Sequence, residues 1–560
     1  MRPLLGSRLD EGPDADVTDG TDAPGGAVSG GAVSGDAVSG GTVRRRALRE
    51  RAVVLAAPVL LVVLQAVITV LRVGQVRDGY GTRNLEASYH VLLTVESLLR
   101  NPLSESWGLP TLTLGAPNDK WIGWGAAVAT EHGDFVYTSF PPAGFWLPTL
   151  LAAVRGGELG LAGLVALNGV LAAICGVLLY ALVTRAVVRM ERSIGLARFA
   201  GVCAALLYLL SPEALQSHGA VYWPHSLLQP VLLGQLVLLE RLLLPGTSDA
   251  SRRRLLWGLG VLTAVGCYTE WTAFVFALGT GALVLAVPAL RRRARAAGVV
   301  LVAVGLGTAV VLATHYVLAL GLGDAVEAWS GRFVDRAGSG ATYQHLLLGY
   351  AQSFGGALLA VLVIVALAAY WPADRGRRDA VGPVLVAASL VAVAENVILL
   401  QHASQFTFDR LKFGIPLALL AGLTIARLTR AGILVAGIAV GVAGVLGIAG
   451  DRSEATFYGA WPGAVRTNED MVDRIRGVID LECATIGSDL GVRAYVNLLL
   501  DRGVHETVTP AELERIAGDE DSCGTVHLEL EYLYADLPLI ATATVVPAGG
   551  EPVRLAAPGY

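Results

Sequence analysis

Apolar residues in this chain are gathered into runs, separated by shorter polar segments. Residues 143–154 form a run that is too short to span a bilayer and is closed by Gly156-Gly157, which favours an interfacial helix. Eleven other runs predict membrane-spanning helices: 52–71, 161–184, 199–211, 226–244, 255–268, 272–290, 297–320, 347–370, 382–401, 412–427 and 431–449. The pattern therefore predicts a mostly α-helical, polytopic membrane protein.

The composition supports this interpretation. Of the 560 residues, 54% are hydrophobic, and the mean hydropathy is +0.58, which excludes an ordinary soluble protein. The net charge of -5 conceals a strong asymmetry, because arginines cluster in short loops while acidic residues lie elsewhere.

The arginine clusters predict how the chain is oriented. They precede the first run or lie between later runs, at 44–51, 185–198, 252–254, 291–295, 375–378 and 427–430. Basic loops remain in the cytoplasm, and the eleven runs place every one of these clusters on the same side. We therefore expect a multi-pass protein of the cell membrane, with a cytoplasmic N-terminus and an extracytoplasmic C-terminus.

The two ends of the chain differ from its centre in composition. Residues 1–43 are rich in Gly, Asp, Ser and Ala and repeat Gly-Ala-Val-Ser-Gly, which predicts a disordered cytoplasmic tail. The transmembrane domain is expected over 44–450. Residues 451–560 predict a small extracytoplasmic α/β domain, with a helix over 471–479, strands over 484–488 and 525–531, and a helix that starts at Pro510.

Cys483 and Cys523 are the two cysteines in a polar region, and both fall in the expected outer domain. Oxidising conditions there favour a disulfide between them, and two free thiols in a small core are the alternative. No cysteine spacing indicates a zinc site, and no phosphate-binding or dinucleotide motif is recognisable. A divalent metal remains open as a cofactor, and a nucleic-acid partner is not expected.

The polar segment 73–160 is expected to form an outer loop that holds the most suggestive chemistry. Apolar spacing predicts a helix over 83–99, which would place Arg83, Glu86 and His90 on one face. Glu86 is a candidate general base beside the membrane, and His90 a candidate substrate ligand. The alternative is the solvated face of an interfacial helix.

Several other outer-side residues are candidates for substrate binding. Glu270, where two runs meet, suits sugar hydroxyls or a metal, unless it is a loop acid at the headgroup level. Arg410 and Lys412, with His402 nearby, can hold a lipid phosphate, and snorkelling basic residues are the alternative. Arg332 and Arg336 form a second phosphate candidate, although Asp335 and Glu327 can pair with them.

Two short motifs carry a resemblance to a known family. The segments Leu85-Glu86-Ala87-Ser88-Tyr89 and Pro141-Pro142-Ala143-Gly144-Phe145-Trp146-Leu147 resemble motifs at the two ends of the first outer loop in C-type membrane glycosyltransferases. That group includes the dolichyl-phosphate-mannose protein mannosyltransferases and the lipid A aminoarabinose transferases. The similarity in layout covers about residues 52–430.

The resemblance implies transfer of a sugar, with inversion at the anomeric carbon, from a polyprenyl-phosphate donor to a glycan, lipid or protein acceptor on the outer face. Leu85 stands where the family usually has its catalytic Asp. That departure leaves Glu86 to take the role, with Asp78 as the alternative.

Two other classes of protein remain as alternatives. A lipid or sugar transporter, or a flippase, would favour charges at mid-membrane, whereas this chain keeps its acids mostly at the outer ends, with Glu395 as the main exception. A non-catalytic cell-envelope assembly protein would be consistent with the missing Asp. The enzyme is preferred, with a polyprenyl-phosphate sugar, an acceptor and membrane lipids as its partners.

Overall fold

The computed structural model describes residues 39–114, 120–124, 126–338, 340–370, 381–457, 461–519, 522–534 and 537–558. Most of the expected N-terminal tail, and the arginine cluster at 375–378, lie outside this part of the chain. The first helix begins at Ser39, so the last five residues of the expected tail are helical.

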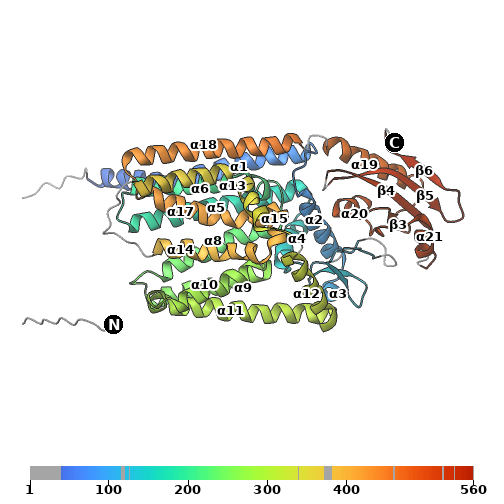
Figure 1. The fold of residues 1–560 in the computed structure, drawn as a ribbon, viewed down its shortest axis with the longest axis horizontal. Coiled ribbons are helices and arrows are strands. Elements are labelled where there is room, and N and C mark those ends of the chain that lie inside the picture. Colours follow the sequence, from blue (N-terminus) through green and yellow to red (C-terminus); the bar gives the residue numbers. More distant parts are fainter. Residues whose placement is uncertain are drawn as a thin grey trace, which may run out of the picture. The chain divides into compact units, whose positions relative to one another are not determined.

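Every predicted membrane run coincides with a helix (Figure 1). The eleven helices are α1 (Ser39–Arg77), α5 (Leu161–Arg189), α6 (Ile194–Leu209), α8 (Pro224–Leu242), α9 (Asp249–Thr269), α10 (Thr272–Ala286), α11 (Pro288–Leu320), α13 (Tyr343–Tyr370), α14 (Val381–Ile398), α17 (Gly414–Ile425) and α18 (Arg430–Phe457). Six helices of the described chain are long and apolar enough to cross a membrane: those containing Leu55–Arg77, Leu161–Arg189, Pro288–Leu320, Tyr343–Tyr370, Val381–Ile398 and Arg430–Ser453. The protein is thus a polytopic membrane protein, while the number of spans and their direction stay predictions.

Small residues let these helices pack closely. The pairs α5 and α6, α10 and α11, and α13 and α18 run against each other (Figure 1). At Gly201 of α6, an added Cβ would lie 2.9 Å from the carbonyl oxygen of Tyr180 in α5. Such close approach of backbones is typical of helix packing in lipid, where small residues occupy the contacts.

The expected outer loop carries short elements between α1 and α5. They are α2 (Leu85–Arg100), α3 (Leu103–Ser106), the antiparallel strands β1 (Ala127–Ala129) and β2 (Phe135–Tyr137), and α4 (Ala143–Val154). The predicted helices over 83–99 and 143–154 are confirmed by α2 and α4. Gly144 permits α4 to touch α8, because a Cβ there would lie 2.6 Å from Pro224 Cβ.

One detail of the predicted α2 face is wrong. Asn84 precedes the helix in a left-handed conformation, with φ of 61°, so the chain turns before helix α2 begins. Arg83 therefore lies outside the helix, and only Glu86 and His90 share its face at i and i+4 spacing.

Helices also form in the other outer segments. The segment 321–346, expected only as a loop, contains α12 (Leu322–Gly338). The remaining short helices are α7 (Pro212–Ser217), α15 (Leu400–Gln405), α16 (Thr407–Arg410) and the 3₁₀ helix η1 (Leu411–Phe413).

The C-terminal region is a small α/β unit with its own hydrophobic cluster. Its elements are α19 (Trp461–Arg476), β3 (Thr485–Ser488), α20 (Ala494–Leu500), α21 (Pro510–Asp519), β4 (Gly524–Tyr534), β5 (Leu537–Pro547) and β6 (Val553–Ala556). The sheet has the order β3-β4-β5-β6, parallel between β3 and β4 and antiparallel elsewhere (Figure 1). The predicted elements of this region are therefore confirmed.

The predicted disulfide between Cys483 and Cys523 is also confirmed. It joins the segment that leads into β3 to the residue before β4. These two strands are neighbours in the sheet, so the disulfide ties the edge strand β3 to β4.

Candidate functional site

A polar cavity of about 790 Å³ lies between the first outer loop, α12, the α15–α16 segment and the C-terminal unit. Its volume is in the range of a small-molecule binding site. The wall includes Asn84, Glu86, His90, Trp124, Tyr137, Phe140, Trp223, Arg332, Arg336, His402, Phe406, Phe408, Leu490, Gly491, Val492, Arg493, Glu506 and Tyr532. Five of the residues proposed from the sequence are therefore brought together here: Glu86, His90, Arg332, Arg336 and His402.

Leu85 and Glu86, neighbours at the start of α2, have opposite surroundings. The Leu85 side chain is buried in a cluster with Trp461 and Leu539 of the C-terminal unit. Glu86 lines the cavity and accepts a hydrogen bond from the backbone N–H of Ala494, the first residue of α20. Residue 85, the position at which the resembling family has an Asp, thus packs here against the C-terminal unit. The carboxylate that lines the cavity belongs to the next residue, Glu86.

His90 lies one helical turn after Glu86, among aromatic rings. Its ring centroid is 4.3 Å from that of Tyr137, 4.9 Å from Trp124 and 5.2 Å from Trp223. Burial lowers the pKa of His90 to about 3, because the low-dielectric surroundings disfavour the charged ring. At neutral pH this imidazole is therefore an uncharged part of the cavity wall.

The C-terminal unit supplies a second carboxylate to the same cavity. Glu506 accepts a hydrogen bond from the backbone N–H of Val492 at 3.0 Å, and burial raises the pKa of this carboxyl. The Arg493 guanidinium lies 5.7 Å from the centre of the Tyr532 ring. Residues that are distant in sequence, on two separate parts of the fold, thus form one polar wall.

Two arginines from α12 line the same cavity. Arg332 donates from Nε to the Ser139 hydroxyl at 3.1 Å, and Arg336 donates from Nη1 to the Ser139 carbonyl at 3.3 Å. Arg336 is buried and lies over the Phe140 ring at 4.9 Å. Burial lowers its pKa, as expected for a cation removed from water.

Arg336 has no carboxylate within ion-pair distance among the described residues, whereas Arg332 approaches the exposed Asp335 at 3.6 Å. A buried guanidinium without a counterion is costly, and an anionic ligand would balance its charge. The two arginines are spaced i and i+4 on α12, so both side chains lie on one face of the helix and reach Ser139.

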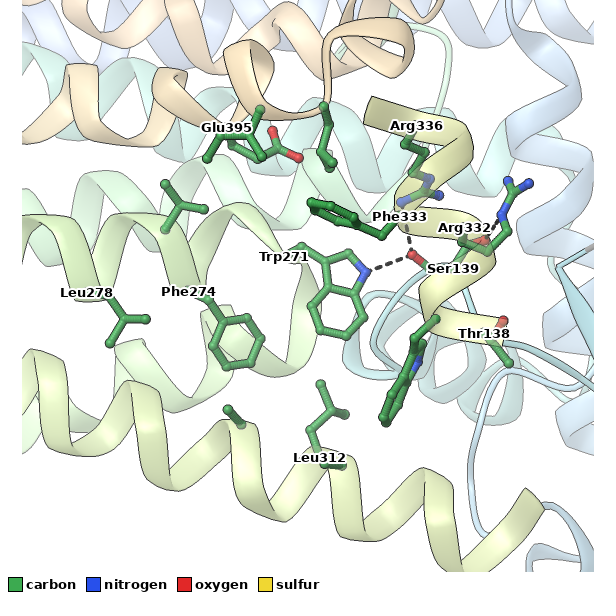
Figure 2. A pocket seen from close by; sticks show the side chains of 16 residues that line it. Thr138, Ser139, Trp271, Phe274, Leu278, Leu312, Arg332, Phe333, Arg336 and Glu395 are labelled. Atoms are coloured by element: carbon green, nitrogen blue, oxygen red, sulfur yellow. Dashed lines mark hydrogen bonds between the residues drawn. The ribbon is translucent and has the colours of Figure 1, made fainter. Parts of the chain in front are cut away.

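The same arginines also border an apolar groove of about 540 Å³ (Figure 2). Figure 2 shows Arg332, Arg336 and Ser139 at one end and Leu278 at the other, with Trp271 and Phe274 between them. Residues of α10, α11, α12 and α14 form its walls. Trp271 donates from Nε1 to the Ser139 carbonyl at 2.8 Å, so Ser139 connects the groove with both arginines.

Three of the expected ligands do not line the polar cavity. Lys412 is buried and contacts Glu395, Asp409 at 2.7 Å and Thr272 at 3.0 Å. Glu270 accepts from the backbone N–H of Thr272 at 3.0 Å. Both belong to a network of buried charges behind the cavity.

The third, Arg410, is the last residue of α16 and is buried. It donates to the Ser353 hydroxyl at 2.9 Å and to the carbonyls of Ala403 and Ser404 at 3.1 and 3.2 Å. The alternative base, Asp78, is exposed at the end of α1 and is not among the residues of the cavity wall.

His402 joins the buried network to the cavity. Its Nδ1 lies 3.2 Å from Asp409, which also contacts His225 at 2.9 Å. Burial lowers the pKa of His402 to about 4, and the contact with Lys412 and the two imidazoles holds the pKa of Asp409 well below its ordinary value although burial opposes this. Asp409, which does not line the cavity itself, thus fixes the position of His402 in the cavity wall.

Sequence reasoning missed the contribution of the C-terminal unit, because no local pattern places Arg493, Glu506 or Tyr532 beside α2. The tryptophans at 121 and 124 were an available signal, since exposed aromatic residues in a polar loop often contact ligands or another domain. Within the described residues, no group of three or more His, Cys, Asp or Glu side chains is arranged to hold a metal ion.

Comparison with known proteins identifies solved structures with a similar fold. No protein-family profile and no curated protein matches the sequence. Among solved structures, ArnT from Cupriavidus metallidurans bound to undecaprenyl phosphate is similar, with a TM-score of 0.54 and 14% identity over 85% of this chain and 93% of ArnT. The archaeal oligosaccharyltransferase AglB from Archaeoglobus fulgidus, in complex with an inhibitory peptide and a dolichol-phosphate, has a TM-score of 0.52 and 14% identity over 84% of this chain and 69% of AglB. The chain therefore shares its fold with ArnT and AglB, which agrees with the resemblance noted from its two short motifs.

Proposed function

We propose that this protein is a membrane glycosyltransferase that moves a sugar from a polyprenyl-phosphate donor to an acceptor on the outer face of the membrane. The observation that carries the proposal is Arg336, a buried cation that borders both the apolar groove and the polar cavity. A lipid with an anionic head group matches this combination of surfaces.

The groove and the cavity would divide the donor between them. Apolar side chains of α10, α11 and α14 suit the polyprenyl chain, which gains free energy by leaving water. Arg332 and Arg336 would hold the phosphate through charge-assisted hydrogen bonds. The sugar would then lie in the polar cavity, beyond the arginines.

In the reaction, the bond between the anomeric carbon and the phosphate oxygen breaks while the acceptor oxygen bonds to that carbon. The acceptor hydroxyl loses its proton to Glu86, and the phosphate leaves with one more negative charge. The two arginines stabilise the charge that develops on the phosphate. Glu86 and the arginines line one cavity, which is the arrangement this division of roles requires.

The residues behind the cavity have a supporting role in this mechanism. Lys412 neutralises part of the charge of Asp409 and Glu395, and Asp409 in turn holds His402 at the cavity wall. Arg410 fastens α16 to α13 and α15 through its three hydrogen bonds. We assign the phosphate to Arg332 and Arg336 because they border the groove, whereas Arg410 and Lys412 are engaged inside the protein.

The experiment is an assay of purified protein with a panel of undecaprenyl-phosphate-linked sugars, in which free undecaprenyl phosphate is measured. Arg336→Gln should weaken binding of undecaprenyl phosphate about 10- to 100-fold, because a charge-assisted partner of the phosphate is removed. Arg291→Gln, an exposed arginine near the start of α11, is the matched control and should bind as the wild type does. Equal binding by wild type and Arg336→Gln would contradict the proposal.

A transporter or flippase is the second candidate, favoured by the buried pair of Glu395 in α14 and Lys412. Charged residues inside spanning helices often mark transport pathways. A flippase would move the lipid-linked sugar without cleaving it, and an assembly protein would bind it without turnover. Release of free undecaprenyl phosphate by the wild type therefore separates the enzyme from both alternatives.

A further inference from the structure

The polar cavity has two ends of opposite charge. Arg332 and Arg336 border the groove, whereas Glu86 and Glu506 lie in the wall that the C-terminal unit helps to build. Among the residues that line this end of the cavity, Arg493 lies beside Tyr532, so the lining here, the acidic end, holds two carboxylates and one guanidinium. An anionic head group is attracted to the arginines and repelled by the carboxylates.

The acidic end is held in place by contacts between the outer loop and the C-terminal unit. The indole N–H of Trp124 donates to the Val492 carbonyl at 3.3 Å, and the Val492 N–H donates to Glu506 at 3.0 Å. The next contact along the chain is the one from the Ala494 N–H to Glu86. The segment that bears Arg493 is thus fixed on both sides, as a preorganised binding site requires.

The side chains of this end suit hydroxyl groups better than charges. Carboxylates only accept hydrogen bonds when ionised, and an arginine only donates, so together they can bind groups that both donate and accept. The Trp124 and Tyr532 rings line the same end and provide apolar faces for C–H groups. A ligand with many hydroxyls, apolar faces and no negative charge satisfies all of these groups.

We infer that Glu86, Arg493, Glu506 and Tyr532 form an acceptor subsite for an uncharged carbohydrate, so that the C-terminal unit selects the acceptor by its charge. The inference rests on the proposed function and deepens it. The donor phosphate occupies the arginine end and the acceptor hydroxyl lies beside Glu86, with the transferred sugar between them. An acceptor that carries carboxylate or phosphate groups at this place is excluded by repulsion from the two acids.

The test measures binding of soluble saccharides to the full-length protein in lipid nanodiscs by saturation-transfer NMR. The probes are maltotriose, mannotriose and galactotriose, with trigalacturonic acid as the anionic counterpart of galactotriose. Wild type should bind at least one neutral trisaccharide and should bind trigalacturonic acid more weakly than galactotriose. Glu506→Gln should weaken binding of the neutral saccharide about 10- to 100-fold, because a hydrogen bond to a charged group is lost.

Undecaprenyl phosphate binding is measured on the same samples and should not change in Glu506→Gln. Glu514→Gln, the same substitution at an exposed position of α21, is the matched control and should leave both affinities unaltered. If Glu506→Gln loses both ligands because its fold is disturbed, Arg493→Gln supplies the test, and it should lose saccharide affinity alone.

Three results would overturn the inference: no binding of any neutral trisaccharide to wild type, preference for trigalacturonic acid, or unaltered saccharide binding in both Glu506→Gln and Arg493→Gln. The two proposals fail in different ways. Saccharide binding without any binding of undecaprenyl phosphate would contradict the proposed function but would still support a carbohydrate site. Binding of undecaprenyl phosphate without saccharide binding would contradict the acceptor subsite alone.

Discussion

At the scale of single residues, the start of α2 shows how one helix can serve both docking and chemistry. Leu85 points into the cluster with Trp461 and Leu539, while Glu86 lines the polar cavity. Successive residues of a helix lie about 100° apart, so neighbours naturally face different surroundings. The carboxylate that the reaction needs is therefore available at residue 86 although residue 85 is apolar.

Glu86→Gln should lower the rate of undecaprenyl phosphate release about 100- to 10,000-fold, because an amide cannot take the acceptor's proton. Donor binding should survive, since the shape of the side chain is kept. Asp78→Asn, at the exposed end of α1, is the control and should retain activity. If instead Asp78→Asn abolished transfer and Glu86→Gln did not, Asp78 would be the base, and if neither mattered the carboxylate mechanism in this loop would be wrong.

Leu85→Asp, which restores the motif of the resembling family, should destabilise the protein rather than activate it. The carboxylate would enter the buried cluster around Trp461 without a partner, at a cost of about 3 to 5 kcal/mol for an unpaired buried charge. Leu85→Met keeps the volume and should cost less than about 1.5 kcal/mol. Thermal denaturation followed by size-exclusion chromatography measures the stability of both variants. Equal melting temperatures for the two variants would contradict a docking role of Leu85 in the buried cluster.

His90 should make stability depend on pH in the acidic range. Its folded-state pKa of about 3 lies below the ordinary value of 6.5, so between these values the unfolded chain binds a proton that the folded protein does not. Stability therefore falls as pH drops below 6.5 and is unaffected by this residue above it. The melting temperature should fall less between pH 7.5 and pH 5 in His90→Gln than in wild type, and identical losses would contradict a neutral, buried His90.

At the scale of elements, α12 and α20 bring the site together. α12 presents Arg332 and Arg336 to the junction of groove and cavity, and the first residue of α20 contacts Glu86. These two elements were not predicted as parts of a site. Arg332 and Arg336 were proposed from the sequence as a second phosphate site, but the helix that carries them was expected only as a loop.

Most of the elements could be predicted from the sequence because their causes are local. Runs of apolar residues, arginine-rich loops and the start of a helix at Pro510 are all read within a few residues. The assembly of the cavity depends on contacts across long distances in sequence, such as those that bring Glu506 near α2. The same limit explains why Arg410 and Lys412 were expected to bind phosphate. Their charges are visible in the sequence, whereas their buried partners, Ser353 and Glu395, are distant in sequence from the expected site or known only from the fold.

The disulfide between Cys483 and Cys523 should stabilise the C-terminal unit by closing a loop of 40 residues. Loop closure of this length is worth about 3 to 4 kcal/mol in the chain-entropy model. The double variant Cys483→Ala/Cys523→Ala should therefore be cleaved faster by a protease in this unit than wild type. Cys267→Ala, a free buried cysteine in α9, is the control, and equal rates for the double variant and wild type would contradict a stabilising disulfide.

At the scale of the whole molecule, the proposed reaction requires the cavity to face the side where the acceptor lies. The loop that holds Glu86, the α12 helix and the C-terminal unit all line this cavity, so they must share one side of the membrane. The arginine clusters at 252–254 and 291–295 lie near the N-terminal ends of α9 and α11. Trp271, which follows α9, and Leu312, toward the C-terminal end of α11, line the groove instead. Because such clusters remain in the cytoplasm, the cavity is expected on the outer side.

This orientation predicts where tags can be reached. In intact cells, a tag after residue 560 should react with a membrane-impermeant reagent, whereas a tag near residue 40 should react only after the membrane is opened. A cysteine placed at Ser330 of α12 should be labelled from outside like the C-terminal tag, since Ser330 belongs to the helix that lines the cavity. Labelling of the C-terminal tag from the cytoplasm would contradict the eleven-span topology, and with it the proposal that transfer takes place on the outer face.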